Sequence, residues 1–150
     1  ICRLRCRLPG RQAVPNHIRK AKNMKQPRQI LNHWMDAVNS GNLEGLLALY
    51  DDTAVLIPTF SNRLLSKPEA LREYFSKLCS RDELSIALHE KTLNIQAIAG
   101  DVHAMNGIYC WRFAVDDELL SFEARFSYML DLSRAKPIVH HHSSQIPRML

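Results

Sequence analysis

The second half of the chain consists of long runs in which apolar and polar residues alternate. Alternation over ten or more residues is typical of strands that bury one face of a sheet. The runs cover 103–115 and 120–130 with the acidic turn 116–118 between them, and a last run covers Ile138–Ser143. Consecutive long hairpin strands restrict the chain to folds that are built on one large antiparallel sheet.

A shorter alternating segment precedes these strands and changes its phase. The pattern of Leu84–Leu88 shifts near Glu90 and continues out of step over Leu93–Ala97. A shift of this kind predicts a bulge or bend in one long strand, as a curved sheet requires. Gly100-Asp101 then predicts a turn.

The first half of the chain has the helical period instead. A stripe of apolar residues spaced by three and four covers 30–38, and Gly41 predicts the end of that helix. Asn42 is placed to cap a short second helix whose apolar residues extend to Tyr50.

A third helix is predicted after a short strand and a loop. Thr53–Ile57 favours a strand, and 58–65 a loop. Ser66–Glu69 then predicts a capping box with proline in the first turn. Together these patterns predict an α+β fold in which three N-terminal helices pack on a curved antiparallel sheet.

Charge is distributed unevenly along the 150 residues. Nine of the 20 Lys and Arg residues lie in residues 1–28 with no Asp or Glu, so the remainder carries 11 basic residues against 15 acidic ones. We therefore expect a basic leader, residues 1–26, followed by one domain, residues 27–150, that does not bind nucleic acid. For the leader, translated upstream sequence, a transit peptide and a phosphate-binding arm remain alternatives.

The cysteines and the hydropathy favour a protein without disulfides or membrane spans. Cys2 and Cys6 have the wrong spacing for a zinc pair, while Cys79 and Cys110 lie in regular elements, where buried free thiols are common. The longest aliphatic run is Ala54–Ile57, which is too short to cross a bilayer. We expect a reducing, cytoplasmic compartment.

Several short segments together resemble a known family. They are Trp34–Ala37, Ser40–Asn42, Leu49–Asp52, Ala54–Leu56, Pro58-Thr59 and the closing Ile138–Ser144 with Pro147. In order and spacing they resemble the nuclear transport factor 2-like, or SnoaL-like, superfamily. The triple histidine is similar to the calcium/calmodulin-dependent protein kinase II association (hub) domain and its stand-alone bacterial relatives.

The resemblance implies a cone-shaped fold with a pocket between helices and sheet, and assembly into dimers or larger rings. One departure is Ala135–Pro137, where family members usually carry a tryptophan. Since proline cannot donate to a sheet ladder, the last strand should begin after Pro137 or lie on an edge.

Glu123 and Arg125 are the first candidate site residues. They share one face of their strand, and Glu123–Arg125 is similar to the Glu-x-Arg segment of the hub domain, whose arginine lines the cavity. An arginine in an apolar cavity would bind a small carboxylate through its planar fork. The alternative is a surface ion pair.

Other candidates come from the aromatic and histidine residues. Tyr50 and Tyr109 are possible hydrogen-bond donors, and Trp34 lines either the pocket or the core. His140 and His142 point the same way from the last strand with His141 opposite, and we expect hydrogen-bonding roles rather than a metal site, since no third ligand is evident. No cofactor motif is present.

Two functions remain open at this stage, beside a purely structural dimer with a closed pocket. The first is a homo-oligomeric, association-domain-like module that binds a small ligand. The second is a SnoaL-like isomerase, cyclase or dehydratase that uses general acid/base chemistry, with Glu123, His103 or His140 as the base. Asp36 and Arg63 are expected to face solvent.

Overall fold

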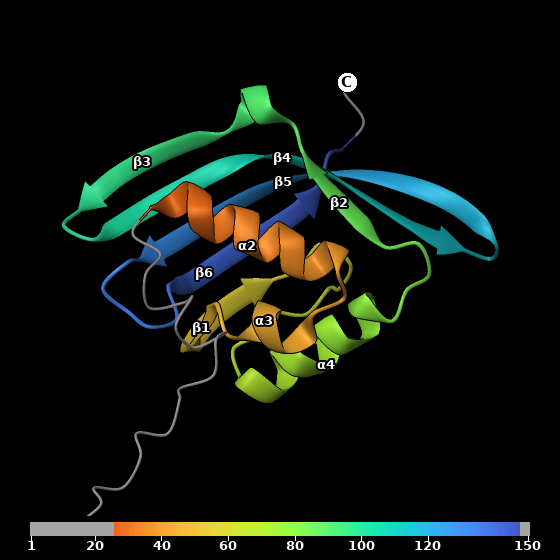
Figure 1. The fold of residues 1–150 in the computed structure, drawn as a ribbon, viewed down its shortest axis with the longest axis horizontal. Coiled ribbons are helices and arrows are strands. Elements are labelled where there is room, and N and C mark those ends of the chain that lie inside the picture. Colours follow the sequence, from red (N-terminus) through yellow and green to blue (C-terminus); the bar gives the residue numbers. More distant parts are fainter. Residues whose placement is uncertain (1–25, 148–150) are drawn as a thin grey trace, which may run out of the picture.

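The computed structural model describes residues 26–147, so almost all of the basic leader expected over 1–26 lies outside the described residues. Three helices lie on one face of a six-stranded sheet (Figure 1). This arrangement confirms the α+β class. Within residues 26–147, no helix is both long enough and apolar enough to span a bilayer.

The helices begin and end close to the positions that the sequence predicts. They are α2 (Pro27–Asn39), α3 (Leu43–Leu47) and α4 (Pro68–Cys79). Gly41 follows α2 at φ +64°, and Asn42 Oδ1 accepts the backbone N–H of Gly45 at 2.9 Å, which caps α3. The prediction of a capping box is wrong, because the N-cap of α4 is Lys67, whose side chain makes no capping hydrogen bond. Pro68 begins the helix.

The sheet has the order β1-β6-β5-β4-β2, and β3 also pairs with β4. The strands are β1 (Tyr50–Ile57), β2 (Ser85–Leu88), β3 (Asn94–Ala99), β4 (Val102–Val115), β5 (Glu118–Asp131) and β6 (Ile138–Gln145). All pairs are antiparallel except β1 with β6, which run parallel, so the sheet is mixed. β6 begins directly after Pro137, as expected, and the Ile138 N–H bonds to the Leu49 carbonyl at 2.9 Å.

Two elements differ from the sequence-based expectation. The predicted single bent strand is two strands, because a 3₁₀ turn over Glu90–Thr92 separates β2 from β3 and both pair with β4. Tyr50 opens β1 rather than ending a helix, since α3 stops at Leu47.

The two faces of the sheet have different surroundings. The inner face, toward the helices, carries a core that is rich in aromatic side chains. Its largest fully buried members are Trp34, Trp111, Tyr109, Tyr128 and Phe75. The outer face carries the exposed alternate residues of β5, and no described helix covers it (Figure 1). The candidate site therefore has to be sought on the inner face, where a cavity can form.

Candidate functional site

Hydrogen bonds link three side chains from three different elements inside the core. Trp34 comes from the buried stripe of α2, Tyr50 from the start of β1 and His141 from β6. Trp34 Nε1 donates to the Tyr50 hydroxyl at 2.9 Å, and that hydroxyl lies 2.8 Å from His141 Nδ1. Because β1 and β6 are neighbours in the sheet, residues 91 apart in sequence meet directly.

The chain of hydrogen bonds continues on the other side of the imidazole. His141 Nε2 lies 3.3 Å from the hydroxyl of Tyr109, which projects from β4. The Tyr109 hydroxyl also interacts with Ser143 and Thr59, and the hydroxyls of Ser143 and Thr59 contact each other. A connected set of polar groups therefore runs from α2 to the loop after β1.

The donors in this chain favour one tautomer of His141. Trp34 Nε1 can only donate, so the Tyr50 oxygen accepts from it and the Tyr50 O–H is free to donate to Nδ1. The proton of the neutral imidazole then lies on Nε2 and is directed to Tyr109.

Burial keeps every group of this chain in its neutral form. Desolvation lowers the pKa of His141 well below 6.5, and the neighbouring His140 and His142 lower it further. Desolvation also raises the pKa of Tyr50 and of Tyr109, although hydrogen bonds from Trp34 and Ser143 act in the opposite direction. At neutral pH the chain offers donors and acceptors but no full charge.

A small cavity lies beside this chain. It has about 10 Å³ of space for the centre of a water molecule, which is room for roughly one water. Its wall includes Tyr109, Trp111, His141, Ser143, Thr59 and Tyr74. Within residues 26–147, no Lys, Arg, Asp or Glu side chain lines it.

Trp111 contributes an unused donor to this wall. Its side chain is 2% exposed, and its Nε1 has no partner with good hydrogen-bond geometry. The group that it approaches is the Tyr109 hydroxyl, whose pKa it lowers slightly. A buried N–H without an acceptor is uncommon and costs free energy. Trp111 therefore holds a buried, poorly satisfied donor beside the Tyr109 hydroxyl, in a residue of the cavity wall.

Three of the residues expected at the site are brought together, and four are not. Trp34, Tyr50 and Tyr109 belong to the buried chain. Glu123 and Arg125 lie on the outer face of β5, because their neighbours Ala124 and Phe126 turn inward. Glu123 Oε1 lies 3.1 Å from His89 Nε2 on the exposed surface. Arg125 is exposed on the same face, so the prediction that this arginine lines the cavity is wrong.

The histidines of β6 are arranged in the opposite phase to the expected one. His141 is 2% exposed and faces inward, whereas His140 and His142 lie on the outer face. The reason is the pairing of β6, in which His141 is opposite Leu56 of β1 and Tyr128 of β5, both of which are buried. Among the described residues, no three His, Cys, Asp or Glu side chains are grouped to hold a metal ion.

The remaining candidates lie away from the cavity. Asp36 and Arg63 are exposed, as expected, and His103 Nδ1 lies 3.2 Å from the Asp101 carbonyl at one end of β4. The sequence analysis missed His141, Ser143 and Thr59. Ser143 follows His141 by two positions and shares its face of β6. The alternation of β6 therefore groups the two residues, but it does not show that their face is the buried one.

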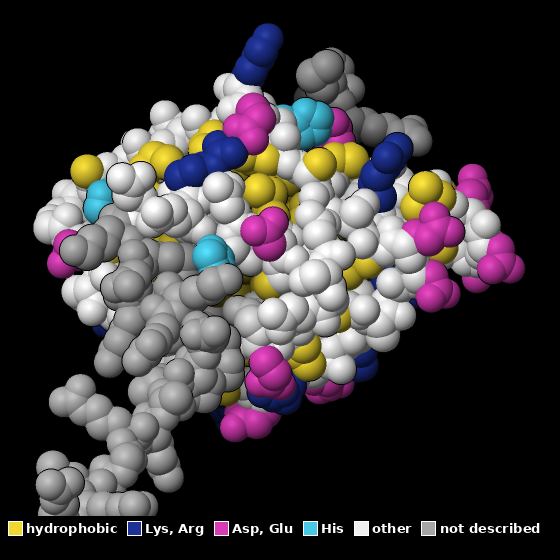
Figure 2. All heavy atoms as spheres, in the orientation of Figure 1, with side chains coloured by type: hydrophobic (Ala, Val, Ile, Leu, Met, Phe, Trp, Pro, Cys, Tyr) yellow, Lys and Arg dark blue, Asp and Glu magenta, His cyan; other side chains and the backbone are white. Residues whose placement is uncertain are grey.

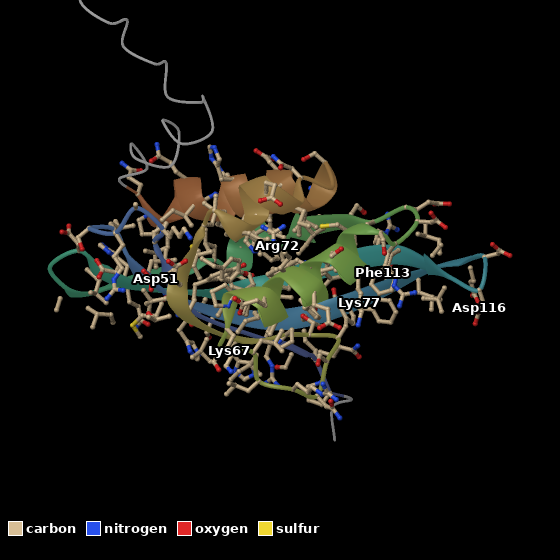
Figure 3. The ribbon with its side chains drawn as sticks, turned by 90° about the horizontal axis from the view of Figure 1, so that it is seen from below. Asp51, Lys67, Arg72, Lys77, Phe113 and Asp116 are labelled. Atoms are coloured by element: carbon tan, nitrogen blue, oxygen red, sulfur yellow. The ribbon has the colours of Figure 1, made fainter. Side chains whose placement is uncertain are left out.

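A larger but more open groove lies on the surface between the start of β1 and helices α3 and α4. Its volume is about 260 Å³, and its rim includes Asp51 and Arg72, both marked in Figure 3. The cations of this rim already have partners, since Arg72 pairs with Glu44 and Lys136 with Asp52. Such a rim offers little free charge to a ligand.

Comparison with known proteins identifies the family. The SnoaL-like domain profile matches residues 28–149. The chain belongs to the SnoaL-like family. Among curated proteins, no sequence matches the chain significantly.

Solved structures share the SnoaL-like fold at low sequence identity. A protein from Xanthomonas campestris, named for the calcium/calmodulin dependent protein kinase II association domain, is 22% identical with a TM-score of 0.73, over 81% of this chain and 86% of that one. An NTF2-like protein with a cystatin-like fold from Novosphingobium aromaticivorans is 12% identical with a TM-score of 0.69, over 88% and 87%. SalBIII, an epoxide hydrolase/cyclase-like enzyme of pyran ring formation in salinomycin, is 14% identical with a TM-score of 0.66, over 83% and 94%. At these identities the likeness establishes the fold.

Proposed function

We propose that this SnoaL-like domain binds a small neutral molecule in its inner cavity and self-associates through the outer face of its sheet. The observation that carries the binding proposal is the convergence of Tyr109, His141, Ser143 and Thr59 on one aromatic-walled cavity, with the Trp111 N–H left without an acceptor. A mostly apolar wall with a few convergent polar groups is the usual form of a ligand site.

The charge state of the cavity argues for a neutral ligand with a hydrogen-bond acceptor. No cation lines the cavity among the described residues, and desolvation keeps His141 uncharged by lowering its pKa. A carboxylate entering this site would lose its hydration without gaining a counter-charge. A small carboxylate that used Arg125 would have to bind on the outer face instead.

Calorimetric titration with acetophenone, a neutral aromatic ketone, tests the binding proposal. We expect binding to the unsubstituted chain, and a loss of affinity of about ten-fold in Trp111→Phe, because the indole N–H donor to the ketone oxygen is removed. Arg125→Ala is the matched control and should bind as the unsubstituted chain does. Equal affinity in Trp111→Phe, or a loss in Arg125→Ala alone, would place the ligand elsewhere.

General acid/base catalysis is the second candidate function. It is favoured by the neutral imidazole of His141, which lies between two hydroxyls and can act as a base through Nε2 when its proton moves to Nδ1. In such a reaction the base takes the proton next to a carbonyl while a hydroxyl donates to the carbonyl oxygen. The structural neighbour SalBIII is named as a cyclase-like enzyme.

Deuterium exchange distinguishes a catalyst from a binding module. In D2O, a catalyst would exchange the methyl protons of acetophenone faster than buffer does, and His141→Gln would remove the acceleration. Exchange at the buffer rate despite measurable binding would leave the binding module as the function. Proton NMR of the methyl signal provides the measurement.

Self-association is supported by the character of the outer face. Half-buried Val55, Ile57 and Ile108 lie on this face with Met129, which is 37% exposed, and they are interspersed with His140, His142 and Arg125. An uncovered sheet face on which apolar and polar residues mix suits a self-complementary contact between two copies. The neighbour from Xanthomonas campestris is named for an association domain.

A further inference from the structure

The loop between β1 and α4 places an aromatic ring against the inner face of the sheet. Phe60 makes edge-to-face contacts with Trp111, Phe113 and Phe122, with ring centroids 5.7, 5.1 and 5.5 Å away. Trp111 also forms part of the cavity wall. Phe60 therefore packs against a residue of the cavity wall without lining the cavity itself.

Both ends of this loop are attached to the domain, whereas its tip is not. Leu56 and Leu65 exchange two backbone hydrogen bonds of 2.8 Å, and Thr59 contacts Ser143. The Phe60 backbone also bonds to the Tyr74 hydroxyl. Between these attachments, residues 62–64 are exposed, and Leu64 is 60% exposed. The tip has few buried contacts and opens at low cost in free energy, whereas release of Phe60 also has to break its bond to Tyr74.

The cavity, whose wall Phe60 adjoins through Trp111, is too small for a ligand in this structure. Room for about one water cannot accept even a single aromatic ring. The surrounding core rings are held by β4, β5 and α2, while Phe60 alone among the contacting rings belongs to a loop. Phe60 is thus the ring that can leave without disrupting regular structure.

We infer that Phe60 is a specificity-determining gate, and that the ligand is a planar aromatic molecule with one hydrogen-bond acceptor whose ring replaces Phe60 against Trp111, Phe113 and Phe122. This inference rests on the proposed function, since the acceptor is held by the Trp111 N–H and the Tyr109 hydroxyl. The ligand and Phe60 compete for one subsite, so binding requires the loop to open.

Calorimetry on two variants of the full chain tests the competition. In Phe60→Ala the subsite is empty, and we expect acetophenone to bind about ten-fold more tightly or better than to the unsubstituted chain, because no closed state has to be opened first. Acetophenone should also bind more tightly than ethylbenzene, which has similar size and no acceptor. Leu64→Ala, in the same loop without ring contacts, is the matched control and should change the affinity for neither acetophenone nor ethylbenzene. Phe60→Leu provides a smaller change if the alanine variant does not fold.

Limited trypsin digestion of the unsubstituted chain tests the opening directly. Arg63 lies at the exposed loop tip, and Arg134 lies in a remote turn, ion-paired with Asp51 and Asp131. With saturating acetophenone, we expect cleavage after Arg63 to become several-fold faster while cleavage after Arg134 is unchanged, as mass spectrometry of the fragments would report.

The outcomes separate the two proposals. If acetophenone bound Phe60→Ala and the unsubstituted chain with equal affinity, the gate would be overturned and the cavity site would remain. Slower cleavage after Arg63 in the presence of acetophenone would have the same meaning. Equal binding of acetophenone and ethylbenzene in Phe60→Ala would keep the subsite but remove the acceptor from the ligand class. No binding of acetophenone to the unsubstituted chain or to either Phe60 variant would overturn the proposed function and the gate together.

Discussion

His141 is the most tightly enclosed polar residue of the cavity. Its ring stacks on Tyr128 at a centroid distance of 3.9 Å and meets Trp34 edge-on at 5.4 Å. Both ring nitrogens have hydroxyl neighbours, on Tyr50 and Tyr109. A buried polar group that is fully hydrogen-bonded stabilises a single packing arrangement. The imidazole therefore serves the fold as well as the candidate site.

Protonation of His141 should make stability depend on pH. The folded state holds the pKa of His141 well below 6.5, so in the range below pH 6.5 the unfolded chain binds a proton that the folded chain does not. The free energy of unfolding should therefore fall as the pH is lowered from 7 to 5, by up to about 1.4 kcal/mol per pH unit. Urea unfolding at several pH values measures this slope.

Two substitutions control this prediction. His141→Gln should flatten the slope between pH 7 and 5, whereas His142→Gln, on the outer face, should retain it. The pKa of Asp51 is lowered to about 2 by hydrogen bonds from Thr53, so its own contribution is lost only below about pH 4. A slope that persists in His141→Gln would assign the titration to another group.

Tyr50 and Tyr128 should respond in opposite ways to loss of their hydroxyls. The Tyr128 hydroxyl is buried without a partner, so Tyr128→Phe should leave the free energy of unfolding unchanged or raise it by about 1 kcal/mol. Tyr50→Phe should lower it by about 2 kcal/mol or more, since Trp34 Nε1 and His141 Nδ1 both lose a partner. Equal effects in thermal or urea unfolding would contradict the hydrogen-bond chain.

At the scale of elements, β4 organises the sheet. Its first half pairs with β3 and its second half with β2, and the change occurs where the 3₁₀ turn lies. Ile108 N–H donates to Thr92 Oγ1 at 2.8 Å, and the Ile108 carbonyl accepts from His89 N–H at 3.0 Å. These bonds satisfy the backbone of β4 across the interruption.

Gly107 lies at this interruption, beneath the Phe126 ring. A Cβ at Gly107 would approach Phe126 Cζ to 2.8 Å, which is closer than real contacts allow. We expect Gly107→Ala to lower the free energy of unfolding by about 1–3 kcal/mol through overpacking. Adding Phe126→Leu should recover part of this loss, and a double-mutant cycle by urea unfolding would measure the coupling. Strictly additive effects would contradict the clash.

The turn between β4 and β5 has an unfavourable backbone for its sequence. Asp116 and Asp117 both have positive φ, 51° and 64°, in a two-residue hairpin connection that favours glycine. We expect Asp117→Gly to raise the free energy of unfolding by up to about 1 kcal/mol. The reverse substitution Gly100→Asp, at φ 52°, should lower it by a similar amount. A loss of stability in Asp117→Gly, measured by thermal unfolding, would contradict this reasoning.

At the scale of the whole molecule, the two faces of the sheet differ in their surroundings. The inner face encloses the cavity, and the outer face, through which we propose self-association, carries exposed residues. Acidic side chains gather at the tip of the β4–β5 hairpin, at the right of Figure 2, where Asp116, Asp117 and Glu118 are exposed. This repulsive tip favours a contact through the middle of the sheet over one that joins the tips.

Light scattering on the eluted protein tests self-association. We expect a dimer or larger ring, and we expect Met129→Glu to shift it toward the monomer, because a carboxylate that is buried without a partner in the contact is unfavourable. Lys67→Glu, next to α4 on the helical side, is the control and should keep the assembly. A monomeric unsubstituted chain at high protein concentration would overturn the proposal.

The sequence alone determined most elements, their turns and the family, because periodicity, Gly and Pro report on local backbone states. Gly41, Asn42 and Pro68 illustrate this, since each has the position in its helix end that local chemistry favours. The same patterns predicted an antiparallel sheet, although parallel pairing of β1 with β6 joins strands that are far apart in the sequence.

Only the tertiary structure decided which residues form the site. Alternation along a strand defines two faces but does not say which face is covered by the helices. In β6 the three successive histidines are equally polar, so the sequence does not show which of them faces the core. Pairing with Leu56 and Tyr128 turned His141 inward, while the register of β5 turned Glu123 and Arg125 outward. A ligand site depends on that phase, because side chains one position apart in a strand point to opposite sides of the sheet.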